Sequence, residues 1–151
     1  MPKPNNRSKA RSAARLAAVQ ALYQMEMEAT PLRQLLVEFH HHRLGGDIEG
    51  EQLVQAEADF FDAVVAGVDA RAEEIDALIV GKLASGWSLE RLDKPMKAIL
   101  RAGTWELIAR ADIPKAAAIS EYVDVAKAFY EAREAGFVNG LLDAIAKDVR
   151  T

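Results

Sequence analysis

Apolar residues recur along most of the chain at intervals of three and four, which is the spacing of helices that bury one face. No run alternates apolar and polar residues for long enough to predict a β-strand. Glycine and proline fall between the periodic segments, where helices commonly begin and end. The pattern therefore predicts an all-α protein of about seven helices.

Local signals mark the expected boundaries of these helices. Thr30 is a suitable N-cap for a helix with Pro31 at its first position. The helices are expected over about 8–28, from Pro31, from Glu51 to an interruption near 67–71, around 75–83, from Pro95 to about Asp112, after Pro114 and after Gly136. In the first helix we expect an inward stripe, formed by Leu16, Val19, Tyr23 and Met27.

The helix that begins at Pro95 is unusual because it is apolar on two sides. Opposite its main apolar face lies a second group, Lys97, Arg101, Trp105 and Ile108. Either the helix is clasped between two layers, with Trp105 and Ile108 in a second core, or Lys97, Arg101 and Trp105 form an exposed basic and aromatic stripe. Since large aromatic side chains are mostly buried, we expect the clasped arrangement.

The length and composition narrow the class of protein. A chain of 151 residues, half of them apolar, suits a single folded domain, here over 1–151 with a basic N-terminal arm. The absence of cysteine excludes disulfides, a thiol nucleophile and thiolate metal sites. No apolar stretch is long enough for a membrane span and the basic start lacks the apolar segment of a signal peptide, so we expect a cytoplasmic protein.

Charge is distributed unevenly along the chain. Residues 1–15 hold five basic residues and no acid, although the whole chain has a net charge of −4. Arg11 and Arg15 lie four positions apart on one helix face, with Arg7 and Lys9 about one turn ahead. A helix start is itself partly positive, so these side chains are candidate RNA phosphate contacts. The alternative is an ordinary charged terminus.

Catalytic and metal-binding patterns are missing from the sequence. The phosphate-binding loops GxGxxG and GxxxxGK[ST] and the nucleophile elbow GxSxG do not occur. The run from His40 to His42 places successive rings about 100° apart on a helix, so the three rings cannot converge on one ion. We interpret this run as a solvated helix end with at most a weak pH response. No enzymatic activity, metal or cofactor is expected.

Three segments carry a resemblance to a known family: 96–114, 118–129 and 136–143. Within them, the most specific pieces are Phe137-Val-Asn-Gly140 and the pattern Leu-Arg-x-x-x-x-Glu-Leu that ends at Leu107. Together with Arg15, 18–23 and 60–68, they resemble the NusB family of bacterial transcription antitermination factors in the same order along the chain.

The resemblance implies an all-α fold of two packed three-helix bundles and no enzymatic activity. It also implies binding to boxA, a single-stranded RNA element of nascent transcripts, and pairing with NusE, a small-subunit ribosomal protein. In that setting the protein helps RNA polymerase in an antitermination complex to read through terminators, notably in ribosomal RNA operons. Single-strand binding of this kind needs a few cations for phosphates and planar side chains for base stacking.

The resemblance also implies roles for individual residues. The arm with Arg7, Arg11 and Arg15 matches the arginine-rich RNA-binding start of the family. Further positions match the RNA path or the NusE contact: Lys97, Arg101, Arg133 and Phe137 for RNA, Tyr23 and Met96 for NusE. Phe137 is either a stacking platform or a helix-start residue that packs into the core.

This chain departs from the family pattern in three places. The run of adjacent arginines is diluted to Arg11-Ser-Ala-Ala-Arg15, Met96 replaces an acidic residue, and 131–136 differs from the usual polar linker.

Two other interpretations of the function remain. One is the helical domain of a ribosomal RNA cytosine methyltransferase, although the chain has no methyl-donor loop. The other is a homodimeric helical scaffold without an RNA role.

Overall fold

The computed structural model describes residues 4–42 and 51–150, and the side chains of 9–41 and 58–150 within these ranges. The described residues form α-helices, one short 3-10 helix and no strand. The α-helices are α1 (Pro4–Glu28), α2 (Leu32–His42), α3 (Glu51–Ala70), α4 (Ala72–Lys82), α5 (Lys94–Ala109), α6 (Lys115–Phe129) and α7 (Ala132–Val149), and the 3-10 helix is η1 (Leu89–Arg91). The prediction of an all-α protein of about seven helices is confirmed.

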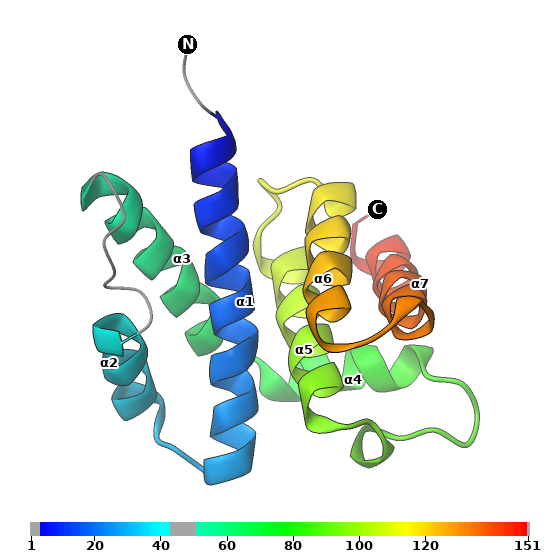
Figure 1. Ribbon diagram of the computed structural model, residues 1–151. Helices are drawn as coiled ribbons and strands as arrows, with labels where there is room; N and C mark the ends of the chain where they lie inside the picture. Colours follow the sequence, from blue (N-terminus) through cyan, green and yellow to red (C-terminus); the bar gives the residue numbers. More distant parts are fainter. Residues whose placement is uncertain (1–3, 43–50, 151) are drawn as a thin grey trace.

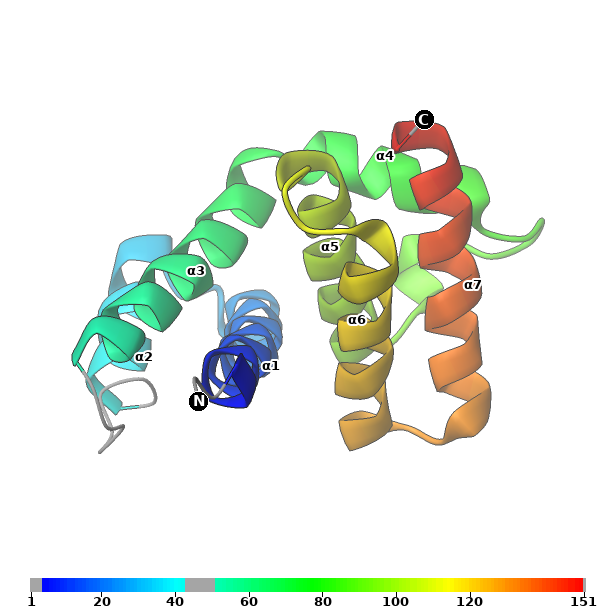
Figure 2. The same cartoon turned by 90° about the horizontal axis from the view of Figure 1, so that it is seen from above.

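The helices form two groups that pack side by side (Figure 1). Helices α1, α2 and α3 make one bundle, and α5, α6 and α7 make the other. Helix α4 continues from α3 and crosses the second bundle, where it contacts α5 and α7 (Figure 2). Helix α1 lies at the junction, in contact with α3 on one side and with α5 and α6 on the other. The two predicted three-helix bundles are confirmed, with α4 as an additional helix.

Helix α1 fits between its neighbours because its buried face is made of small residues. This face consists mainly of Ala14, Ala17, Ala18, Ala21 and Val19, with Leu22 and Arg15 as its larger members. Small side chains allow neighbouring helices to approach closely. Because these alanines supply the contact with α3 and α5, the side chains of Tyr23 and Met27 remain exposed. The expected inward stripe was therefore wrong for Tyr23 and Met27 and correct for Val19.

Helix α5 is the centre of the fold and is buried on two sides. Trp105 is buried, and it faces Gly67 of α3 so closely that a Cβ atom on this glycine would lie 2.0 Å from the indole Nε1. On another side of α5, a Cβ on Gly103 would lie 2.8 Å from Leu142 of α7. The clasped arrangement is confirmed, and the exposed stripe through Trp105 is excluded.

Helix α7 begins at Ala132, four residues before the glycine that was expected to precede it. Gly136 lies inside the helix, where an added Cβ would meet nothing within 4 Å. A helix tolerates such an exposed glycine at a cost of about 1 kcal/mol, so the glycine signal set the predicted boundary wrongly. Phe137 consequently lies in the second turn and is exposed, and it is not a helix-start residue packed into the core.

None of the helices in the described part of the chain is long and apolar enough to cross a bilayer.

Candidate nucleic-acid interface

A buried ion pair joins the two bundles. Arg15 of α1 donates from Nη2 to Oε2 of Glu106 in α5 at 2.6 Å and from Nε to Oε1 at 3.0 Å. The two side chains are only 6% and 0% exposed. The Tyr122 hydroxyl of α6 donates to Glu106 at 2.7 Å, and Arg15 Nη1 donates to Glu121 of α6 at 2.9 Å. Three helices from both bundles therefore share one network, which we call the Arg15 network.

The Arg15 network shifts the pKa values of Tyr122 and Arg15. Burial raises the pKa of Tyr122 well above its usual range, and the charge of Glu106 adds to the rise. Burial alone would lower the pKa of Arg15, but the hydrogen bond and the charge of Glu106 outweigh it and raise this pKa. A neutral tyrosine and a charged arginine are thus the stable forms around the Glu106 carboxylate.

This geometry changes the interpretation of Arg15. We expected its guanidinium on the exposed face of α1, yet Nε, Nη1 and Nη2 all donate to carboxylates inside the molecule. A buried cation is paired because an unpaired one would be costly to desolvate. In this conformation Arg15 is not presented to a phosphate, and it holds α1 against α5 and α6.

Three guanidinium groups surround the buried ring of Phe60 in α3. Arg11, Arg15 and Arg110 place their Cζ atoms 4.6, 5.1 and 5.4 Å from the ring centroid. We call these three residues the arginine cluster. Cation–π contacts of this kind contribute about 0.5–2 kcal/mol and fix the orientation of the side chains. Arg110 was missed by the sequence reasoning, because nothing near the end of α5 indicates that it meets the start of α1.

The other arm residues have different positions. Lys9 is exposed and lies two positions before Arg11. Both residues belong to the N-terminal part of α1. Arg7 lies in the same helix, but its side chain is outside the part of the chain whose side chains the structure describes. Among the arm side chains that the structure describes, the exposed basic part is therefore Lys9 with part of Arg11.

Lys97 and Arg101 do not form a free basic stripe. Lys97 Nζ lies 2.5 Å from Glu26 of α1, and Arg101 pairs with Glu26 at 2.7 Å and with Asp76 of α4 at 2.8 Å. Burial by itself would raise the pKa of Glu26, but the hydrogen bonds from Lys97 and Arg101 lower it below the usual value. Two cations and two carboxylates thus balance one another and join α1, α4 and α5.

Arg133 and Phe137 lie on a separate surface. They belong to the first two turns of α7, and α6 stands between α7 and α1 (Figure 2). The Arg133 side chain is 92% exposed, with a single contact of 3.5 Å to Glu134, and Phe137 is also exposed. The structure therefore brings Arg11 and Arg110 together but does not place Phe137 beside them.

The two expected partner residues have opposite environments. Tyr23 is 38% exposed, and Met27, one turn further along α1, is exposed as well, so this helix offers an apolar surface. Met96 is only 4% exposed and belongs to the core. The expected partner contact of Met96 is corrected accordingly, because the first turn of α5 points this side chain inward.

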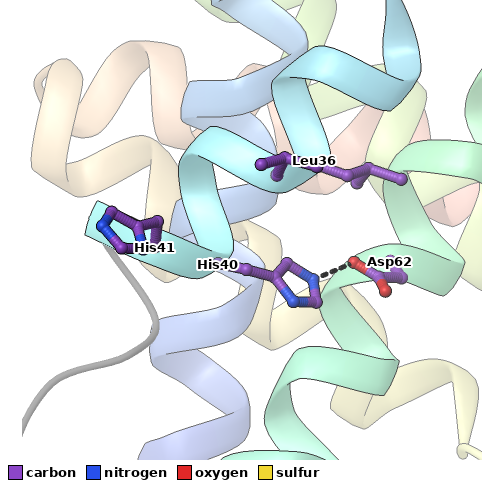
Figure 3. Close-up of a pocket in the computed structure, with 5 residues that line it drawn as sticks. Leu36, His40, His41 and Asp62 are labelled. Carbon is purple, nitrogen blue, oxygen red and sulfur yellow. Dashed lines mark hydrogen bonds and ion pairs between the residues drawn. The ribbon is translucent and has the colours of Figure 1, made fainter.

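A hollow of about 390 Å³ lies between α2 and α3, with Leu36, Val37, His40, His41 and Asp62 as its lining residues. His40 turns toward Asp62 and is hydrogen-bonded to it, whereas His41 points elsewhere (Figure 3). Among the described residues, no group of histidines and carboxylates is arranged to hold a metal ion. Asp62 follows Phe60 by two positions and so lies on the other side of α3 from the arginine cluster.

The chain is similar to proteins of one family over nearly its whole length. A model described as the NusB family matches residues 12–147. The transcription antitermination protein NusB of Sphingopyxis alaskensis is 68% identical over 146 residues, which cover 97% of this chain and 98% of that protein. The protein of the same name from Novosphingobium aromaticivorans is 64% identical over 142 residues, which cover 94% and 96%.

Solved structures agree with the sequence relatives. A structure of T. maritima NusB matches with a TM-score of 0.77 and 32% identity, covering 91% of each chain. A crystal structure of the antitermination factors NusB and NusE in complex with dsRNA matches with a TM-score of 0.76 and 26% identity, covering 93% of this chain and 98% of that one. In sequence and in fold, the chain belongs to the NusB family.

Proposed function

We propose that this protein is a transcription antitermination factor that acts without enzymatic activity in the cytoplasm. It binds boxA RNA in nascent ribosomal RNA transcripts together with NusE, as part of the antitermination complex of RNA polymerase. The observation that carries this proposal is the 68% identity, over 97% of the chain, to a transcription antitermination protein NusB. The similar structure that contains NusB, NusE and dsRNA supports the two binding roles.

The proposed RNA contacts follow from exposure and charge. Lys9 and the exposed part of Arg11, with Arg7 ahead of them in α1, supply cations for the RNA backbone. Arg133 adds a cation on the α7 surface, and the neighbouring ring of Phe137 offers a plane on which a base can stack. Base stacking on an aromatic side chain contributes about 1–3 kcal/mol.

The ion-paired residues contribute to RNA binding by holding the helices that carry these contacts. Arg15 fixes α1 against the second bundle, and Lys97 and Arg101 join α1 to α4 and α5 through carboxylates. Their charges are already neutralised within the protein, so they attract phosphate less than Lys9 or Arg11 do. We assign the three residues a supporting role in the proposed RNA surface.

The proposed NusE surface is the exposed apolar part of α1 around Tyr23 and Met27. Tyrosine is frequent at the centre of protein interfaces, because one rigid side chain supplies apolar area and a hydroxyl group. Both residues lie in the C-terminal half of α1, away from the basic N-terminal turns of the same helix. One helix can therefore contact RNA with one half and NusE with the other.

Salt dependence tests the proposed RNA role directly. If three or four cations meet phosphates, the slope of log affinity for boxA RNA against log salt should be about −2 to −3, at roughly 0.7 per phosphate of a single strand. Arg11→Ala should lower the affinity and reduce the slope by about 0.7, with unchanged helicity, because alanine is a good helix former. Fluorescence anisotropy at several salt concentrations measures both quantities.

Arg33→Ala provides the matched control, since Arg33 is an exposed arginine of α2 outside the proposed RNA surface. Annealing the boxA strand to its complement tests whether the single strand is preferred. A slope near zero, or equal losses for Arg11→Ala and Arg33→Ala, would refute backbone binding at the arm.

A further inference from the structure

The three members of the arginine cluster differ in how they are paired. Arg15 is committed to buried carboxylates, as described above. Arg110 forms a two-pronged pair with Asp112, from Nε to Oδ1 and from Nη2 to Oδ2, each at 3.0 Å. Arg11 has a buried Nε without a hydrogen-bond partner among the described residues. Unlike Arg15, Arg110 is thus paired with an exposed carboxylate, and Arg11 keeps a buried Nε without a partner.

The pair between Arg110 and Asp112 lies at the surface. The Asp112 side chain is 63% exposed, and it follows the end of α5 in the short connection to α6. The hydrogen bond from Arg110 lowers the pKa of Asp112, and the charge of Arg11 adds to this lowering. Arg11 and Arg110 therefore act on the same carboxylate from two different bundles.

An exposed ion pair of this kind contributes little to stability because water screens it. The guanidinium fork that receives two carboxylate oxygens has the same geometry toward two oxygens of a phosphate. When a phosphate replaces the Asp112 carboxylate as the acceptor, Arg110 keeps its two hydrogen bonds, and the free energy lost with the exposed ion pair is small. The phosphate would also gain the nearby charge of Arg11, which already acts on Asp112.

We propose that Arg110 and Arg11 form a binding site for one phosphate group of the RNA backbone, at the junction of the two bundles. Without RNA, Asp112 orients the Arg110 guanidinium. When RNA binds, the phosphate replaces Asp112 as the acceptor of these hydrogen bonds. The ring of Phe60 packs against both guanidinium groups. The inference rests on the proposed RNA-binding function and adds Arg110, a residue of the second bundle, to the surface formed by α1.

The site makes two predictions of opposite sign for boxA RNA binding. Arg110→Ala should weaken binding about tenfold and reduce the salt slope by about 0.7, because one phosphate contact is lost. Arg110→Lys, which keeps the charge but loses the fork, should fall between this variant and the wild type. Asp112→Asn should strengthen binding several-fold, because it removes the anion that competes with the phosphate. Fluorescence anisotropy with the full-length protein measures all three affinities.

The pair between Arg71 and Glu74 provides a matched control. It has the same two-pronged geometry, with both distances at 2.9 Å, and it is also exposed. It lies at the α3–α4 connection, well below the α5–α6 connection in the view of Figure 1. Arg71→Ala and Glu74→Gln change the net charge by the same amounts as Arg110→Ala and Asp112→Asn, and they should leave the RNA affinity nearly unchanged.

The outcomes separate this site from the proposed function. RNA binding by the wild type with no change in the Arg110 and Asp112 variants, or with equal changes in the control pair, would overturn the site alone. No RNA binding by the wild type, with or without NusE, would overturn both. Titration with inorganic phosphate checks for a free anion: tight binding of phosphate with unchanged RNA affinity in Arg110→Ala would also overturn the RNA assignment. Thermal unfolding of each variant confirms that it is folded.

Discussion

Replacing Glu106 by glutamine is expected to reduce the free energy of unfolding by about 3–5 kcal/mol. The substitution keeps the shape of the side chain but removes the negative charge that faces Arg15 inside the molecule. Glu121, which is partly exposed, would then be the one charged partner left to Arg15 in this network. A buried arginine without its main partner carries an uncompensated desolvation cost. Urea unfolding with linear extrapolation measures the change.

Glu121→Gln serves as the control for this measurement. Glu121 contacts the same guanidinium through Nη1 alone, and its side chain is 26% exposed, so water can replace part of the contact. We expect a loss of about 1 kcal/mol or less. Equal losses for Glu106→Gln and Glu121→Gln would show that the Arg15 network does not depend on the buried partner.

Replacing Gly67 by alanine is expected to destabilise the protein by about 2 kcal/mol or more. The new Cβ would lie 2.0 Å from Nε1 and 2.4 Å from Cε2 of Trp105, which is a large buried side chain of α5. Overpacking in a core typically costs about 1–3 kcal/mol, and the clash here is severe. The higher helix propensity of alanine, worth about 1 kcal/mol, does not compensate.

Replacing Gly81 by alanine is expected to change the free energy of unfolding in the opposite direction. Gly81 lies in α4, and a Cβ there would meet nothing within 4 Å. The gain in helix propensity should therefore stabilise the protein by up to about 1 kcal/mol. Parallel unfolding curves of the two variants make the comparison, and a gain for both would contradict the close packing of α3 on α5.

Much of the fold was predictable from the spacing of apolar residues. The two apolar sides of the helix after Pro95 correctly indicated a helix buried between two layers, because a large aromatic side chain such as Trp105 is mostly buried. The inward face of the first helix was harder to predict. Its buried residues are mostly alanines, and the larger side chains of Tyr23 and Met27 looked like better core residues than they are.

The candidate site was predictable only in part. Helical spacing placed Arg11 and Arg15 on one face. However, Arg15 is buried by its pairing with Glu106, which lies 91 positions away in the sequence. Likewise, Arg110 approaches Arg11 only because α5 ends beside the start of α1. Such contacts depend on how the two bundles pack, which a single sequence without its structure does not reveal.

We expect the protein and NusE to form one composite surface for boxA RNA, as the proposed function implies. The protein carries a net charge of −4, and the proposed RNA surface has only a few exposed cations among the described side chains, so the protein alone should bind RNA at micromolar affinity or weaker. Bound NusE should raise the RNA affinity about 5- to 150-fold, which corresponds to a coupling of about 1–3 kcal/mol. Tyr23→Asp should abolish this increase while leaving the RNA affinity of the lone protein unchanged.

The most direct test is titration of one boxA RNA onto the lone protein and onto the preformed pair with NusE. We expect tighter binding to the pair, and RNA should strengthen the contact between the proteins by the same factor, because both steps belong to one thermodynamic cycle. Equal RNA affinity for the lone protein and for the pair would contradict a composite surface.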